Sequence, residues 1–239
     1  MVGSGPVLTP ELLLLADSRL PAGGHGHSGG VEALVDRGML STEDDLAGFL
    51  SGRLRTGAAV PAAAAAAACV LARDTPGAGS TPGWARWDGA VSARTPAAAA
   101  REASRAQGAA LLRTAAVAWS SAAFDALRRL PRPHHALVLG VATAAAGGGP
   151  DAAAALAVHH LVGGACTAAV RLLGLDPLRV AAVAVRAGRA AGALLVTAVA
   201  DAAAAVAADD PGLLPTDGSP LTDVLAQLHH RSEATLFAS

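Results

Sequence analysis

The chain has 239 residues, of which 63 are alanine and only 3% are aromatic, and its formal net charge is −1. Alanine has the highest helix propensity, so this composition predicts helices and excludes a β-sandwich or β-barrel. The 18 basic residues are all arginine and are scattered along the chain, which argues against a nucleic-acid-binding surface.

Capping residues and prolines divide the chain into helices. Thr9 before Pro10 begins the first helix, Ser28 is expected to cap the second, and a hydroxyl followed by three acids marks the third. The helix that begins at Pro177 is expected to run unbroken to Ala208. In chain order, the predicted helices begin near Pro10, Ser28, Thr42, Pro61, Pro96, Pro133, Asp151, Pro177 and Leu221.

These elements predict one all-α domain over residues 1–239, a bundle of about nine or ten helices. The domain has a short flexible N-terminus (1–8), loops at 74–83 and 209–220, and a tail at 229–239. We interpret the alanine runs as close-packed helices rather than disorder, because small side chains let helix axes approach one another. Cys69 and Cys166 each lie in such a run and are expected to be buried free thiols.

The chain is expected to be cytoplasmic. No charged segment precedes the apolar run Leu12–Leu15, and this run is too short for the core of a signal peptide. The longer apolar segments are interrupted by Pro61, Arg113 and Asp201, so none is expected to reach the roughly 18 to 20 strongly apolar residues of a membrane span. No membrane association is therefore predicted.

The eight histidines fall in four close groups. His25 and His27, on a glycine-rich loop, are the pair best able to chelate nickel, zinc or copper. Adjacent histidines on a helix point about 100° apart, so the pairs at 134 and 159 are expected on helix surfaces or in ordinary packing. The glycine-rich loop lacks the preceding strand and the Lys-Ser/Thr of a phosphate-binding loop.

Three charged residues are not explained by helix capping. Glu32 and Glu102 neither begin a predicted helix nor cap one, and Arg171 lies inside an apolar run, where it needs a partner or a path to solvent. No serine lies in a nucleophile-elbow pattern, and no acid–base arrangement emerges from the other residues. The residues therefore indicate no active site.

Four segments of the chain form a pattern when they are taken in order. The first, 15–32, contains Leu20, Pro21, Gly23, Gly24, Ser28, Gly30 and Glu32. The second, 93–112, contains Glu102 and Arg105; the third joins 135–140 to 168–173; the fourth runs from His229 through Leu236 and Phe237 to the end. Together the four segments resemble the urease accessory protein F (UreF) family, whose pattern the seven named residues of the first segment match.

Some positions depart from the family's pattern. His25 and His27 stand where the family has aromatic residues, and Gly29 replaces a glutamine. Asp176 begins a segment that stands in place of a Gly-Gln-Thr-Asp-Gly-Gln stretch, and His230 replaces a glutamate. The chain therefore resembles a divergent member of the family, and its bias toward alanine and arginine fits an actinobacterial type.

The resemblance implies a non-enzymatic maturation factor for urease. Family members are all-α homodimers that bind accessory protein D (also called H); the pair recruits the GTPase accessory protein G, and the complex delivers nickel to apo-urease. Such a factor has no cofactor of its own, because the complex handles the nickel. The resemblance assigns partner binding to Pro21, Gly23, Gly24, Ser28, Glu32, Glu102, Arg105, Arg171, His229, Leu236 and Phe237.

The resemblance implies two partner-binding surfaces. Ser28, Glu32 and the turn at Gly23 and Gly24 would lie near a surface that faces the GTPase or the second copy of the dimer. The tail from His229 to the C-terminus would contact accessory protein D/H, since short apolar ends can become ordered against a partner.

Two other classes of function stay open from the residues alone. One is a helical metalloenzyme that uses His25, His27 and a second histidine pair; the other is a nickel carrier that uses the same histidines without catalysis. Tight stoichiometric metal binding with turnover would favour the metalloenzyme. A scaffold would instead bind metal weakly by itself and depend on its partners.

Overall fold

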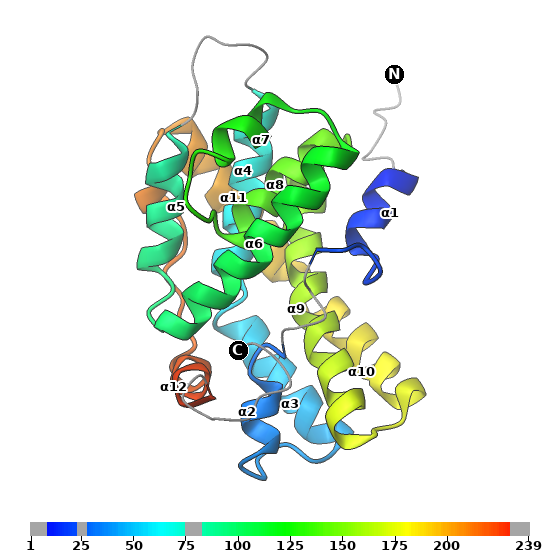
Figure 1. Ribbon diagram of the computed structural model, residues 1–239. Helices are drawn as coiled ribbons and strands as arrows, with labels where there is room; N and C mark the ends of the chain where they lie inside the picture. Colours follow the sequence, from blue (N-terminus) through cyan, green and yellow to red (C-terminus); the bar gives the residue numbers. More distant parts are fainter. Residues whose placement is uncertain (1–8, 23–27, 75–82, 230–239) are drawn as a thin grey trace.

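The computed structural model describes residues 9–22, 28–74 and 83–229, and every regular element in these ranges is helical. Figure 1 shows the helices in one compact body. This confirms the predicted all-α fold class. The elements are α1 (Pro10–Ala16), α2 (Val31–Val35), α3 (Glu43–Arg55), α4 (Ala59–Arg73), α5 (Trp84–Ala93), α6 (Ala98–Ala118), α7 (Ala122–Leu127), α8 (His135–Ala145), α9 (Pro150–Leu173), α10 (Pro177–Ala190), α11 (Gly192–Ala207), η2 (Pro211–Leu213) and α12 (Pro220–His229).

Helix α4 is the centre of the core. Its alanine run, Ala62–Ala68, is completely buried, and the helix packs against α8, α9 and α11. The partner α8 comes so close that a Cβ at Gly140 would lie 2.2 Å from the carbonyl oxygen of Ala65. The alanine run and this glycine together allow two helix backbones to touch, which confirms that the run is a packed helix.

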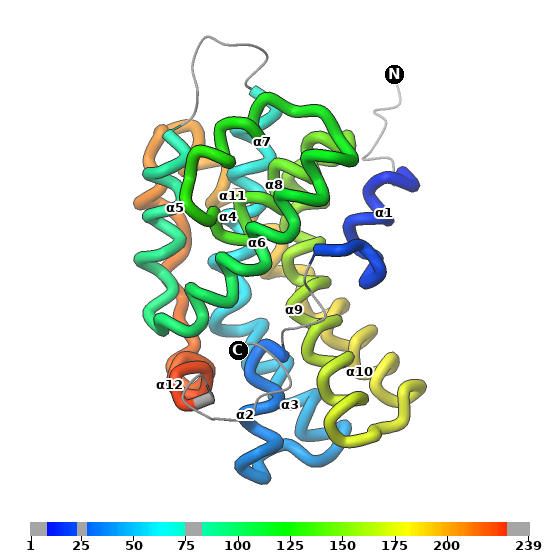
Figure 2. The backbone as a smooth tube through the Cα atoms, viewed as in Figure 1, coloured from blue at the N-terminus to red at the C-terminus, as the bar shows by residue number. Residues whose placement is uncertain are grey.

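The long helix α9 connects two groups of helices, as the tube in Figure 2 shows. Its first half packs with α4, α8 and α11, and its second half lies among α2, α3 and α10. Helix α12 closes the lower left of the body against α2 and α6, and α1 lies on α9 and α8 at the other side. The space between these groups holds the cavity described below.

Several predicted boundaries are confirmed by their caps. Thr9 accepts a hydrogen bond from the amide of Leu12 at the start of α1. Thr42 and Asp45 form a reciprocal capping box at the start of α3. Gly174 ends α9 in the left-handed conformation that a glycine adopts without strain.

Two expectations about helix boundaries are wrong. Ser28 does not cap α2; the N-cap is Gly30, with φ of 99°, and Glu32 lies in the first turn, although the sequence had not placed it at a helix start. The helix expected over 177–208 is two helices, α10 and α11, bent by 48° at Ala191. After the bend, α10 packs against α3 and α9 while α11 packs against α4.

One expectation about apolar length is also wrong. Helix α9 has 24 residues and a mean hydropathy of 1.5 in its most apolar window, which is long and apolar enough to cross a membrane by these two measures. More than half of this window, 56%, is buried inside the fold. Its apolar side chains are therefore covered by the other helices of the same chain.

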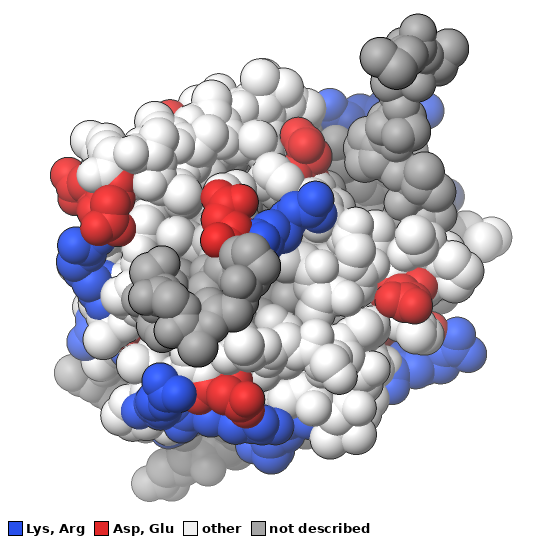
Figure 3. Space-filling view, turned by 90° about the horizontal axis from the view of Figure 1, so that it is seen from above, with Lys and Arg blue, Asp and Glu red and all other residues white. Residues whose placement is uncertain are grey.

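The surface carries both signs of charge. In the view of Figure 3, acidic and basic side chains lie in small separate groups with broad uncharged areas between them. Several are local pairs, such as Arg128 with Asp125 at 2.7 Å and Arg132 with Glu102 at 2.6 Å. This face therefore carries no basic stripe of the kind that binds nucleic acid.

Candidate partner-binding site

A half-open cavity of about 710 Å³ lies between the two helical groups. The segment after α1 crosses one end of it, and α6 and α9 form its long sides. The other end is closed by α3, the start of α4, and α12. Its walls are mostly apolar, with a few polar groups at the two ends, which is the usual character of a binding cavity.

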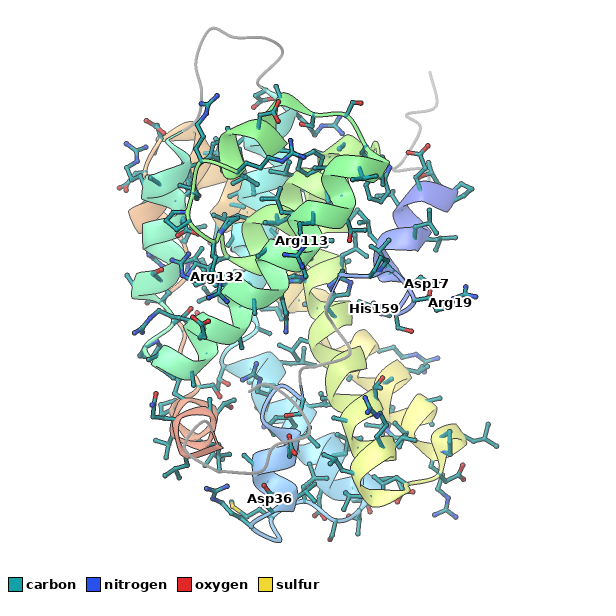
Figure 4. The ribbon with its side chains drawn as sticks, in the orientation of Figure 1. Asp17, Arg19, Asp36, Arg113, Arg132 and His159 are labelled. Atoms are coloured by element: carbon teal, nitrogen blue, oxygen red, sulfur yellow. The ribbon has the colours of Figure 1, made fainter. Side chains whose placement is uncertain are left out.

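Two adjacent histidines of α9 bind the last turn of α1, where the segment after α1 begins. The Nε2 of His160 donates to the carbonyl oxygen of Leu15 (2.7 Å), and that of His159 donates to the carbonyl oxygen of Ala16 (3.1 Å). These are carbonyls of the last turn of α1, which have no partner inside the helix. Figure 4 shows His159 pointing toward this segment, close to Asp17 and Arg19. The pair at 159 is therefore used in packing.

The same segment is fixed at two further points. Arg19 pairs with Asp17 at 2.6 Å, and this contact lowers the pKa of the Asp17 carboxyl to about 2. The hydroxyl of Thr114 on α6 donates to the carbonyl oxygen of Pro21 (2.7 Å). Pro21 itself is exposed, and its neighbours Leu20 and Ala22 line the cavity.

Ser28 and Glu32 lie inside the fold. Ser28 is completely buried and its Oγ has no hydrogen-bond partner among the described residues, while Glu32 is 4% exposed. Gly30, between them, could not be replaced without strain, because its φ is 99° and a Cβ would lie 3.3 Å from Thr222 on α12. These residues therefore shape the turn and its contact with α12 rather than present side chains to solvent.

Arg105 belongs to a polar network that joins α5, α6 and the start of α8. Its guanidinium donates to Asp88 Oδ2 and Ser92 Oγ, both at 2.8 Å, and to the carbonyl oxygen of Arg132. The ring of His134 lies in the same network, with Nε2 2.8 Å from Ser92 Oγ and Nδ1 2.9 Å from Ser104 Oγ. Burial lowers the pKa of His134 to about 4, so the ring is neutral near pH 7.

The network also depends on a close backbone approach. The amide of His134 donates to Asp88 Oδ1 (2.9 Å), so this carboxylate binds the α8 start and Arg105 together. A Cβ at Gly108 on α6 would lie 2.0 Å from the carbonyl oxygen of Pro133. Arg105 therefore has a structural role in addition to any contact it makes with a partner.

Glu102 and Arg171 are exposed and lie apart. Glu102 pairs with Arg132 across the surface of α6, and Figure 4 shows Arg132 on that face. Arg171 is near the C-terminal end of α9, and its side chain is exposed. No predicted partner-binding residue within the described ranges lines the cavity, although Ala22, Gly30 and Ser104 beside them do.

The remaining predicted site residues lie outside the ranges that the structure describes. Gly23, Gly24, His25 and His27 fall in 23–27, and Leu236 and Phe237 fall in 230–239. His229 is the last residue of α12, and its side chain is not among those described.

Metal ligands do not gather in the part of the chain that the structure describes. Within residues 9–22, 28–74 and 83–229 no group of three or more His, Cys, Asp or Glu side chains could hold a metal ion. The rings of His135 and His160 are 5.4 Å apart, and those of His159 and His160 are 5.9 Å apart. Two of these three rings are already bonded to backbone carbonyls.

Sequence reasoning missed the polar residues of the network and of the far end of the cavity. Asp88 and Ser92 are isolated polar residues in a helix that the sequence did not reveal, and Arg53 and Asp223 lie 170 residues apart. The signal for Asp88 and Ser92 was their spacing of four residues, which places both on one face of a helix. No local pattern connects Arg53 to Asp223.

Comparison with known proteins gives a consistent result. Residues 40–188 match the UreF family. The chain is 42% identical over 228 residues to a urease accessory protein UreF of Mycolicibacterium vanbaalenii, covering 95% of this chain and 97% of that protein. It is 40% identical over 228 residues to UreF of Mycobacterium marinum and 39% identical over 230 residues to UreF of Mycobacterium tuberculosis, with the same coverage of both chains.

Proposed function

Because this chain belongs to the UreF family of urease accessory proteins, which act in urease maturation without catalysing a reaction, we propose that it works as a scaffold in the maturation complex. With accessory protein D/H it recruits the GTPase accessory protein G, and the assembly inserts nickel into apo-urease. It acts as a homodimer in the cytoplasm. The observation that carries this proposal is the similarity to UreF proteins over 95% of the chain.

Nickel is the cargo of the complex in this proposal and not a cofactor of the chain. The family's non-catalytic role rules out the helical metalloenzyme that the histidines left open. A nickel carrier remains the second candidate, because His25 and His27 are suitable ligands by residue type. Metal titration of the protein alone distinguishes it from the scaffold, which binds nickel weakly without partners.

Two surfaces are proposed for the partners. The exposed turn at Pro21, supported from inside by Ser28, Glu32 and Gly30, faces the GTPase or the second copy of the dimer. The segment from His229 to the C-terminus binds accessory protein D/H. Glu102 and Arg171 extend these surfaces from α6 and α9, where both are exposed.

The experiment is size-exclusion chromatography with light scattering, on the protein alone and mixed with accessory proteins D/H and G. We expect a homodimer that forms a larger complex with D/H and recruits G only when D/H is present. A chain truncated before His229 should lose the D/H complex, and Glu32→Ala should weaken the later step by disturbing the turn. A monomer that ignores both partners would contradict the proposal.

A further inference from the structure

Arg53 is a half-buried arginine whose side chain makes no hydrogen bond to another described residue. It lies in the last turn of α3, and its side chain lines the closed end of the cavity. Its Nε is fully buried and has no hydrogen-bond partner. Among the described residues, none receives a hydrogen bond from this guanidinium or lies within ion-pair distance of it.

Other half-buried arginines in the described ranges are bonded. Arg105, for example, pairs with Asp88 at 2.8 Å. Arg94, which also lines the cavity, donates to the carbonyl oxygens of Ala90, Gly212, Leu214 and Pro215 and so fixes the loop before α12. A guanidinium offers five N–H donors, and a buried donor without a partner is costly. Arg53 stands out because its buried Nε has no partner among the described residues and its side chain lines the cavity.

The charged group that faces Arg53 is Asp223 on α12. The two attract each other, but they do not come within 4 Å, so no direct ion pair is formed. Burial raises the pKa of the Asp223 carboxyl, and the charge of Arg53 and the amide of Ala97 oppose that effect. Three other residues with charged side chains line the cavity: Asp17 pairs with Arg19, Arg94 binds carbonyl oxygens, and Asp217 is exposed on the loop before α12.

We propose that Arg53 anchors a carboxylate that enters the cavity from outside, and that this carboxylate is an Asp or Glu side chain of a partner protein. A carboxylate is the group that matches a guanidinium best, because it accepts two parallel N–H bonds. The cavity is open to the surface and has apolar walls, which suits the side chain and flanking residues of a docked segment.

A protein is the source favoured over a small molecule because UreF proteins are not enzymes, so the chain has no use for a small substrate. This part of the inference rests on the proposed scaffold function. The carboxylate site itself does not, since it depends only on Arg53 and the cavity.

A purely structural role of Arg53 makes different predictions. If Arg53 served only to offset the charge of Asp223, replacing either residue would change stability and no added carboxylate would bind. If Arg53 is a binding residue, Asp223 competes with the incoming carboxylate. Asp223→Asn should then tighten carboxylate binding, whereas Arg53→Gln should abolish it.

The test uses the full chain labelled with ¹⁵N and titrated with sodium propionate, with propionamide as the uncharged control and sodium chloride at matched ionic strength. The backbone amides of Gly30 and Gly57, which line the cavity, report binding in every variant. We expect saturable shifts with half-saturation at about 1 to 100 mM propionate, no response to propionamide, and tighter binding in Asp223→Asn by at least about threefold. No saturable response, an equal response to propionamide, or an unchanged response in Arg53→Gln would overturn the site.

The partner is tested separately by the affinity of the assembled complex. Arg53→Gln should weaken complex formation at least about tenfold, which corresponds to about 1.4 kcal/mol. Arg128→Gln removes the same charge from an exposed residue at the C-terminal end of α7 and should leave the affinity unchanged. A complex that forms equally well with Arg53→Gln would refute the partner as the source of the carboxylate. If the wild-type chain forms no complex, the scaffold function fails while the propionate titration still decides the site.

Discussion

The contact between α4 and α8 should be the place where the fold tolerates a single methyl group least. In Gly140→Ala the new Cβ would lie 2.2 Å from the carbonyl oxygen of Ala65, 2.7 Å from the Cβ of Ala68 and 2.9 Å from the amide nitrogen of Cys69. Two of these three atoms are backbone, so no side chain can rotate away. The helices must instead move apart by about 1 Å to reach ordinary contact.

Two effects of the substitution oppose each other. Overpacking of a tight core costs about 1 to 3 kcal/mol, and the short distances here place Gly140→Ala at the upper end of that range. Replacing glycine by alanine inside a helix contributes about 1 kcal/mol in the stabilising direction. We therefore expect a net loss of about 2 kcal/mol, which lowers the Tm by about 4 to 8 °C in a domain of this size.

The matched control is Gly48→Ala in the middle of α3, where nothing lies within 4 Å of the added Cβ. This variant keeps the helix-propensity gain without the clash, so it should be stabilised by about 1 kcal/mol. Urea unfolding followed by far-ultraviolet circular dichroism measures both variants against the wild type. Equal stability of Gly140→Ala and Gly48→Ala would refute the close approach of α4 and α8.

Three further predictions concern a cap, a buried ring and the thiols. Thr42→Ala should destabilise the chain by about 1 kcal/mol in the same urea assay, because it removes one half of the capping box at α3. His134 has a folded-state pKa of about 4, below its unfolded value near 6.5, so its contribution to stability is complete above pH 6.5 and is lost as the pH falls toward 4. That loss, up to about 3 kcal/mol, should be absent from the pH profile of unfolding in His134→Gln, and an unchanged profile would contradict the burial. Burial raises the pKa of Cys69 to about 12 and of Cys166 to about 11, so a thiol reagent at pH 8 should modify both only after unfolding; rapid labelling of the native chain would be the contrary result.

Local chemistry was enough to predict many of the helices. The capping box at Thr42, the proline at Pro177 and the glycine at Gly174 fix helix ends within a few residues, so their effects can be read from the sequence. The same reasoning failed at Ala191, where α10 ends and α11 begins. Every residue near this break has a side chain that a continuous helix accepts, apart from Gly188 and Gly192, so local propensity gave no clear stop.

The candidate site, too, could be predicted only in part from the sequence. The sequence singled out Glu102 and Arg171, and the family pattern added Pro21 and connected all three to partner binding; the structure shows that all three are exposed. The sequence could not show that Ser28 and Glu32 are buried, because residue type does not say which side of a turn faces the core. It also gave no sign that Arg105 binds Asp88 and Ser92 across two helices.

The amino-acid sequence by itself determined the all-α class and most of the helix ends, because propensity and capping act over three or four residues. Only the tertiary structure decided which helices meet. It placed Arg53 of α3 and Asp223 of α12 at one end of a cavity, and it brought His159 and His160 to the end of α1. Such contacts join residues more than a hundred positions apart, and they follow from how whole helices pack rather than from any pattern within one of them.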